Sequence, residues 1–117
     1  MSFSNCYLTN DTVDKAFKKV YRAKLLATLG QPNEIKDIRN NKNYCTEWQQ
    51  EYIYYVDTAS EFKHDTVGNN SVTYVAFVFD QCEKYVVRIS YGYYLRRKDY
   101  RYHAFWCKPN GYWLGYK

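Results

Sequence analysis

Apolar residues recur every three or four positions in the first quarter of the chain, which is the spacing of one helix face. The apolar positions are Val13, Ala16, Phe17, Val20, Ala23 and Ala27. Side chains suited to an N-cap occur at residues 9–12, and Gly30 and Pro32 are typical of a helix end. We therefore predict one helix from about residue 12 to residue 29. Lys24 falls near the centre of the stripe, so it either extends past the stripe to water or marks a bend.

Beyond residue 47 the pattern changes to the alternation that is typical of strands. Residues 48–56 are aromatic and β-branched, with Tyr52 and Tyr54 on one face. Residues 72–79 are apolar on both faces, as expected of a central strand. Residues 33–43 show no clear period, and we favour a loop there over a short helix.

Three further strands are predicted in the C-terminal third, at residues 84–91, 99–106 and 112–116. Pro109 and Gly111 favour a hairpin turn between the last two. A helix followed by a run of strands is typical of the α+β class. We expect an N-terminal helix packed on an antiparallel sheet of about five strands, in a single domain that spans the 117 residues.

Composition narrows the classes of function. Hydrophobic residues make up 46% of the chain and charged residues 25%, which excludes wholesale disorder. The longest apolar run, residues 75–79, is too short to span a membrane, so we expect no membrane contact. The first residues lack a basic segment followed by an apolar stretch, so we expect a cytoplasmic protein, in the host cell cytoplasm if it is virus-encoded.

Few residues are suited to catalysis or to metal binding. The cysteines are Cys6, Cys45, Cys82 and Cys107. They are scattered without a Cys-x-x-Cys pair, so we expect reduced, buried thiols and neither metal nor cofactor. Of the two histidines, His64 lies in a polar acidic loop and His103 alternates with Arg101 on a predicted strand. Asp57, Glu61 and Asp65 lie near His64 in the sequence, but a solvated acidic loop explains them more simply, and an exposed strand position explains His103. We therefore expect no enzyme.

The net charge of +5 is unevenly distributed. Residues 1–24 carry a net charge of +3, residues 25–83 carry −5 and residues 84–117 carry +7. Both ends of the chain are thus basic and the middle is acidic. The basic third is also rich in tyrosine, of which the chain has 15. It can supply a positive field that attracts an acidic partner.

In the basic third, basic residues are interleaved with tyrosines. The basic residues are Arg88, Arg96, Arg97, Lys98 and Arg101, and the tyrosines are Tyr91, Tyr93, Tyr94, Tyr100 and Tyr102. Arginine and tyrosine together suit phosphate pairing and base stacking, and the same residue types are enriched at protein-binding hot spots. A third interpretation is that the tyrosines cover the sheet while the arginines stay in water. The residues that we expect to contact a partner are Tyr93, Tyr94, Arg96, Arg97, Arg101, Tyr102 and His103.

Four short stretches carry a resemblance to a known family. They are Leu-Ala-Thr-Leu-Gly-Gln-Pro at residues 26–32, the Trp/Tyr strand at 48–56, Val-Ala-Phe-Val-Phe-Asp at 75–80 and Val-Val-Arg-Ile at 86–89. Together they resemble the SmpA/OmlA domain of outer-membrane assembly lipoproteins, which is similar to the repeats of β-lactamase inhibitory protein. The resemblance covers residues 25–92 and implies a non-enzymatic scaffold that binds other proteins across its sheet.

The chain departs from that family in two ways. It shows no lipoprotein signal or acylated N-terminal cysteine, so an envelope role does not carry over. The basic, tyrosine-rich tail from residue 93 to residue 117 also lies outside the family pattern. The resemblance names no partner.

The sequence as a whole favours a small non-enzymatic binding protein. We expect an inhibitor or adaptor that occludes a host protein or ribonucleoprotein surface, and the alternative is a nucleic-acid-binding protein that uses the same basic aromatic patch. Lysine, asparagine and tyrosine supply 35 residues, which is typical of A/T-rich genes and agrees with a phage or mobile-element origin. The partner's identity and the oligomeric state stay open.

Overall fold

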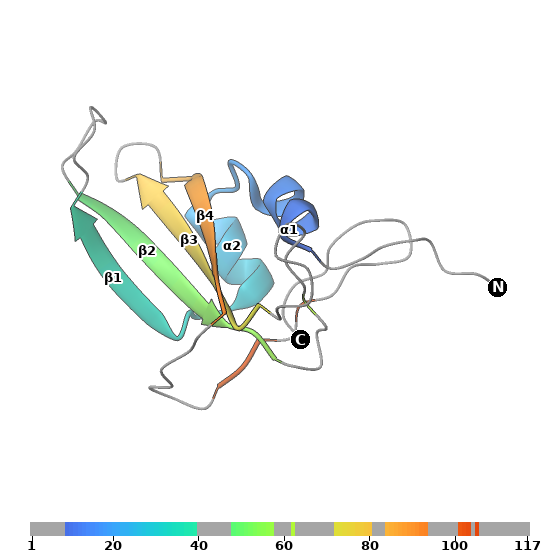
Figure 1. Cartoon of the computed structure of the whole chain (residues 1–117). Helices are drawn as coiled ribbons and strands as arrows, with labels where there is room; N and C mark the ends of the chain where they lie inside the picture. The colour runs from blue at the N-terminus through green and yellow to red at the C-terminus, as the bar shows by residue number, and fades with distance from the viewer. Residues whose placement is uncertain are drawn as a thin grey trace.

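The computed structural model describes residues 9–39, 48–57, 62, 72–80, 84–93, 101–103 and 105. These residues form two helices and one sheet (Figure 1). The elements are α1 (Asn10–Phe17), α2 (Arg22–Leu29), β1 (Glu34–Arg39), β2 (Trp48–Tyr55), β3 (Tyr74–Asp80) and β4 (Val86–Gly92). The strands are antiparallel and lie in the order β1-β2-β3-β4, so each pairs with its neighbour in sequence. The α+β class is confirmed.

The predicted number of about five strands is not confirmed, because the sheet has four strands within the described ranges. The strands predicted at 48–56, 72–79 and 84–91 are present as β2, β3 and β4. The segment 112–116 and its hairpin turn lie outside the described residues. Residues 101–103 belong to the strand predicted at 99–106, and His103 forms a short parallel bridge with Val56 at the end of β2.

The single helix predicted for residues 12–29 is wrong, because the structure divides it into α1 and α2. Lys18 leaves the helical conformation, and Lys19 has a φ of 58° in the left-handed region. Two backbone hydrogen bonds then attach this turn to β4: the Lys19 N–H donates to the Val86 carbonyl over 3.3 Å, and the Val86 N–H donates to the Val20 carbonyl over 2.9 Å. Pairing with the sheet has replaced the helical hydrogen bonds that the sequence pattern predicted.

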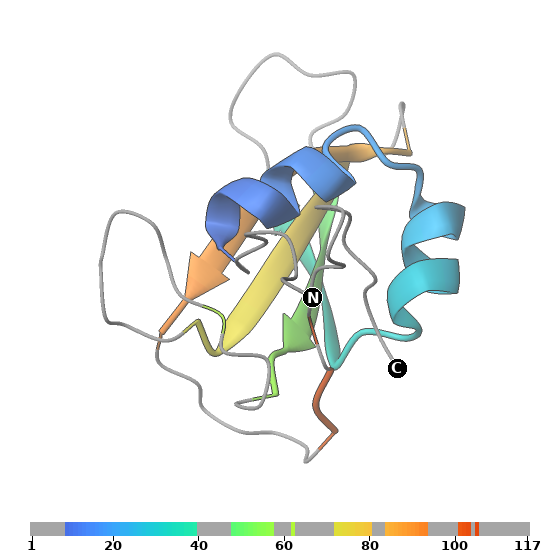
Figure 2. The same ribbon diagram turned by 90° about the vertical axis from the view of Figure 1, so that its right-hand side faces the viewer.

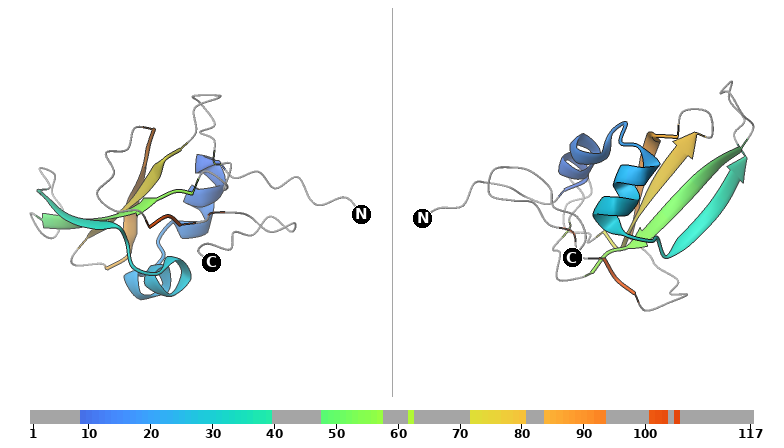
Figure 3. Two further views of the ribbon diagram at one scale, coloured as in Figure 1. Left: turned by 90° about the horizontal axis from the view of Figure 1, so that it is seen from below. Right: turned by 180° about the vertical axis from the view of Figure 1, so that it is seen from behind.

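The loop favoured for residues 33–43 is also wrong where the structure describes it, since Glu34–Arg39 is strand β1. Its alternation is disguised by charge: Ile35 and Asp37 share one face, and Lys36 lies on the other. Charged residues are typical of edge strands, where they discourage further pairing. Seen from behind, β1 lies beyond the area that the two helices cover (Figure 3), and Ile35 is 51% exposed.

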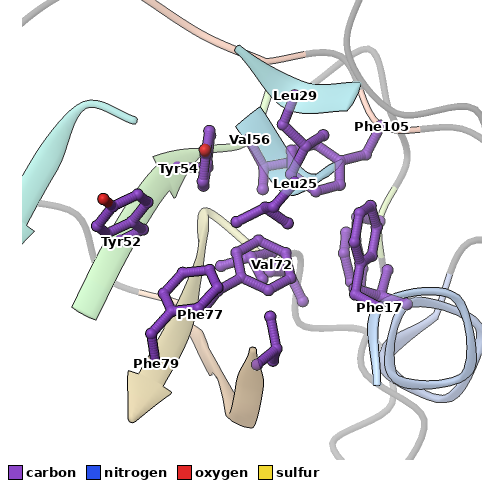
Figure 4. Packing of buried hydrophobic residues seen from close by; sticks show 14 residues of the cluster. Phe17, Leu25, Leu29, Tyr52, Tyr54, Val56, Val72, Phe77, Phe79 and Phe105 are labelled. Atoms are coloured by element: carbon purple, nitrogen blue, oxygen red, sulfur yellow. The ribbon is translucent and has the colours of Figure 1, made fainter. Parts of the chain in front are cut away.

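The main core lies between the two helices and one face of the sheet (Figure 2). Leu25 and Leu29 from α2 and Phe17 from α1 point toward the aromatic side chains of β2 and β3 (Figure 4). The Phe77 ring makes edge-to-face contacts with Phe17 at 5.1 Å and with Tyr54 at 5.7 Å between centroids. This core fixes how α1 and α2 lie against the sheet, and therefore where the turn between them meets β4.

The opposite face of the sheet has a smaller buried cluster of Ile53, Tyr55 and Ala76, with Tyr74 and Tyr102 packed against it. Gly92 is paired directly with Tyr74, and a Cβ at this glycine would lie 1.8 Å from Cε2 of the Tyr74 ring. The glycine therefore leaves the space that lets the Tyr74 ring lie across β4. Close aromatic cover of a glycine on an edge strand is a recurrent device for stabilising sheets.

Candidate functional site

The seven residues predicted to contact a partner are only partly within the described chain. Tyr94, Arg96 and Arg97 lie outside it. Arg101, Tyr102 and His103 are brought together beside the end of β2 and the turn that follows α2. Tyr93 lies elsewhere, at the end of β4, where it is half-buried against the main core. Desolvation by burial raises the pKa of Tyr93.

Residues 101–103 are held to β2 by backbone hydrogen bonds. The His103 N–H donates to the Tyr55 carbonyl over 2.8 Å, and the Asp57 N–H donates to the His103 carbonyl over 2.9 Å. On the same edge of β2, the Asn33 side chain accepts from the Tyr55 N–H over 2.7 Å and donates to the Arg101 carbonyl over 2.9 Å. Asn33 thereby joins the end of β2 to Arg101, which lies 68 residues after Asn33 in the sequence.

Three successive carbonyls of the turn after α2 interact with side chains from this region. The Tyr54 hydroxyl donates to the Gly30 carbonyl over 2.8 Å, and Nε2 of His103 lies 3.1 Å from the Gln31 carbonyl. Arg101 donates from Nη2 to the carbonyl of residue 32 over 3.2 Å. These contacts give hydrogen-bond partners to carbonyls of the turn itself, which lies beyond the last helical residue of α2. We call the three side chains, together with Asn33, the turn clamp.

In the turn clamp, Arg101 and His103 hold the turn after α2 against the end of β2. His103 is only 4% exposed, and its ring meets the Tyr54 ring edge-to-face at 4.8 Å. Tyr102 packs on Tyr55, with ring centroids 6.3 Å apart. A pocket of about 310 Å³ adjoins the clamp, and Arg101 is the one arginine or lysine among the described residues that line it.

Replacing Asn33 with alanine is expected to lower the free energy of unfolding by about 1–3 kcal/mol, because it leaves the N–H of buried Tyr55 without this acceptor. Asn33→Asp keeps the acceptor but sets a carboxylate oxygen against the Arg101 carbonyl in place of the donor, so we expect a loss of similar size. Urea denaturation of both variants measures the difference. Equal stability of wild type and Asn33→Ala would show that the clamp does not hold the segment.

A second cluster lies where the turn between the helices meets the start of β4. Tyr21 and Tyr85 form an antiparallel bridge, and their rings meet edge-to-face at 6.1 Å. Tyr21 is 64% exposed, the largest exposed fraction among the exposed large hydrophobic side chains of the described chain. Exposed cations flank both tyrosines in the sequence, each within three residues of one of them. We define the basic corner as Lys18, Lys19, Tyr21, Lys84, Tyr85 and Arg88.

The backbone of the basic corner is unusual. Lys19 and Lys84 have φ values of 58° and 59°, and both are held there by backbone hydrogen bonds between the turn and β4. The left-handed region costs a residue with a Cβ roughly 1–2 kcal/mol, and such conformations occur more often at functional sites. Arg22 is adjacent in sequence but serves the core, because its guanidinium lies over the Tyr52 and Phe79 rings at 5.7 and 5.2 Å.

A groove runs between α1 and β4 next to the basic corner. Its volume is about 260 Å³, and it is lined by Asp14, Lys18, Val86, Val87, Arg88 and Ile89. The register of β4 against β3 shifts at this point, because Val86 pairs with Phe79 and Arg88 pairs with Val78. Val87 is thus an extra residue in the strand, a β-bulge, and its side chain is 36% exposed.

The sequence predictions missed most of the basic corner. Arg88 was recognised as part of the arginine-tyrosine pattern, but the lysines at 18, 19 and 84 and the two tyrosines were not. A helix predicted to run through residue 20 conceals the turn, and the contact with β4 spans more than 60 residues. The signal that was available is the positive charge of both chain ends, +3 and +7, which the fold brings together here.

Tyrosines predicted as a stacking surface have other contacts in the structure. Tyr91 lies on the helix side of the sheet, where its hydroxyl donates to the Asn10 carbonyl over 2.9 Å and is also bonded to the Asp14 carboxylate. Tyr93 and Tyr102 pack against the two core clusters. Tyr94 and Tyr100 lie outside the described residues.

Other classes of site were searched for in the described part of the chain. No three histidine, cysteine, aspartate or glutamate side chains there are placed to hold a metal ion. Neither of the two helices is long and apolar enough to cross a membrane. The four cysteines and His64 lie outside these ranges, so the expected reduced state of the thiols stays a prediction.

Comparison with known proteins gives no relative: no family model, no curated protein and no solved structure matches the chain. The resemblance to the SmpA/OmlA domain therefore stays a prediction. The case for a function depends on the surfaces described above.

Proposed function

We propose that this chain is a small non-enzymatic binding protein, an inhibitor or adaptor that occludes a surface of another protein, and that the basic corner makes the contact. The observation that carries the proposal is Tyr21, which is 64% exposed among four exposed cations. Tyrosine and arginine are enriched at the energetic centres of protein interfaces, where a ring that loses its water contributes most.

The cations of the basic corner supply the second part of the argument. Lys18, Lys19, Lys84 and Arg88 come from the turn and from β4, which backbone hydrogen bonds hold together. A partner therefore meets a pre-formed group of charges and loses little conformational freedom of the backbone on binding. Charges of one sign on one corner also speed the encounter with an acidic surface.

Direct nucleic-acid binding through a tyrosine surface has less support. Base stacking needs ring faces that are open and follow one another along a groove. Tyr21 and Tyr85 meet edge-to-face, and Tyr91 and Tyr102 are engaged in packing.

The predicted contacts at Tyr94, Arg96 and Arg97 remain part of the proposal. They follow β4 in sequence and continue the basic run that begins at Lys84. We expect them to extend the contact surface, and charge reversal at Arg96 and Arg97 tests this separately from the basic corner. If Arg96→Glu/Arg97→Glu leaves the partner bound, the contact is limited to the basic corner.

The test is affinity capture of protein partners from a lysate of the native host, with the full chain as bait. Wild type and the control Lys36→Glu, which reverses an exposed charge on β1, are expected to recover one partner in stoichiometric amount. Tyr21→Ala is expected to bind that partner about thirtyfold more weakly, the effect of losing a hot-spot side chain. Circular dichroism of each variant confirms that the fold is retained.

Two results contradict the proposal. One is capture of no stoichiometric protein by wild type. The other is salt-sensitive retardation of short RNA or DNA by the purified chain, with log affinity falling by about 0.7 per contact on single strands as log salt rises. That second result supports the nucleic-acid alternative.

A further inference from the structure

The groove between α1 and β4 has a charge distribution that the proposed function does not use. Lys18 lies at the end of α1 and Arg88 lies on β4, and both line the groove as exposed residues. Residues with cationic side chains thus line one cavity of about 260 Å³ from two different elements. Such a cavity accommodates a side chain rather than a whole ring system or cofactor.

One carboxylate lines the same groove but is already engaged. The Tyr91 hydroxyl is hydrogen-bonded to the Asp14 carboxylate, and the backbone carbonyl of Asp14 accepts from the Lys18 N–H over 2.9 Å. Within the described lining, the groove therefore has one excess positive charge. An incoming group with a single negative charge balances it.

The rest of the lining is apolar. Val86, Val87 and Ile89 supply it, and the bulge at Val87 leaves that side chain 36% exposed. A bulge on an edge strand re-aims a side chain, and here it turns an apolar one toward water beside two cations. A ligand that complements the groove must carry apolar groups as well as acids, which an acidic protein segment does and a phosphate backbone does not.

We propose that the α1–β4 groove is the docking site for an acidic, partly apolar segment of the partner protein, with a carboxylate between Lys18 and Arg88 and an aliphatic side chain on Val87. This inference rests on the proposed function and specifies the chemistry that the partner presents. Tyr21 and the lysines at the rim of the basic corner then bind the surface next to that segment.

The probe is a ten-residue peptide that alternates glutamate and valine, titrated into the ¹⁵N-labelled full chain at about 150 mM salt, where exposed charges are largely screened beyond 8 Å. We expect the largest amide shifts at Lys18, Val87 and Arg88. Arg88→Glu and Lys18→Glu are each expected to weaken binding about tenfold, since each places like charge against the peptide. The control Lys36→Glu should bind as wild type does.

A peptide that alternates lysine and valine and a single-stranded DNA of equal charge complete the experiment. Shifts that do not centre on the groove, or an affinity that Arg88→Glu leaves unchanged, overturn the inference. Tighter binding of the DNA to the same residues also overturns it and identifies a nucleic-acid site. Val87→Ser keeps the charges and removes the apolar contact, so we expect it to weaken the glutamate-valine peptide but not to alter DNA binding.

Capture of the partner protein by each variant distinguishes the failure of this inference from the failure of the proposed function. If Tyr21→Ala loses the partner and the two groove variants keep it, the binding function stands and the docking of an acidic segment is wrong. If wild type captures no partner, the proposed function is wrong, whatever the peptide shows.

Discussion

Replacing Phe77 with alanine is expected to lower the free energy of unfolding by about 3–5 kcal/mol. Phe77 lies at the centre of β3, is 0% exposed, and makes edge-to-face contacts with Phe17 of α1 and with Tyr54 of β2. Its removal takes away both the transfer energy of the ring and the packing between the helices and the sheet. Domains of this size are stable by about 5–15 kcal/mol, so the variant is expected to be marginal at best.

Chemical denaturation followed by circular dichroism measures this loss. The control is Ile35→Ala on the edge strand β1, where the side chain is 51% exposed and we expect a loss within about 0.5 kcal/mol. Similar losses for the two variants would contradict the position of Phe77 as the link between the layers. Since Phe17 belongs to α1, Phe77→Ala is also expected to loosen the α1–β4 groove and weaken the glutamate-valine peptide.

The central strands could be predicted from the sequence because their buried positions carry apolar residues, and these show as a pattern along the chain. β3 is apolar on both faces and β2 alternates, and both lie where expected. β1 was missed because an edge strand pairs on one side only and carries charges at Glu34, Lys36 and Asp37. The polarity of such a segment, considered alone, is typical of a loop.

The division of the predicted helix had a different cause. Lys19 adopts a positive φ because its N–H pairs with the Val86 carbonyl, a contact between residues 67 positions apart. Local periodicity holds no information on such a contact. Lys24, whose position in the apolar stripe suggested either a bend or a snorkelling side chain, lies within α2. It therefore did not predict the position at which the helix is interrupted.

The candidate site shows the same limit. Composition and charge indicated that the chain ends are basic and aromatic, and this is the chemistry of the basic corner. Which residues meet could not be deduced, because Tyr21 and Tyr85 are brought together only by the fold. Arg101 and His103 were predicted as contact residues from their place in a basic strand, and their interactions with the turn after α2 could not be foreseen from a separation of about 70 residues.

The turn clamp also makes the stability of this protein sensitive to alkaline pH. Burial, and to a smaller extent the neighbouring Tyr52, raises the pKa of Tyr54 well above the 10.0 that is usual for tyrosine. In the unfolded chain this hydroxyl loses its proton near pH 10, whereas in the folded chain it keeps the proton that it donates to the Gly30 carbonyl. The contribution of the Tyr54 hydroxyl to the free energy of unfolding is constant below about pH 10. Above that pH it falls by about 1.4 kcal/mol per pH unit.

Tyr54→Phe tests this contribution because it removes the titrating group and keeps the ring. At neutral pH we expect the variant to be less stable by about 1 kcal/mol, the net value of the hydrogen bond to Gly30. Above pH 10 wild type loses stability faster, so the two curves of unfolding free energy against pH are expected to cross near about pH 11. Parallel curves for Tyr54→Phe would instead mean that the Tyr54 hydroxyl ionises as readily in the folded chain as in the unfolded one, because the folded state then gives its proton no added stability.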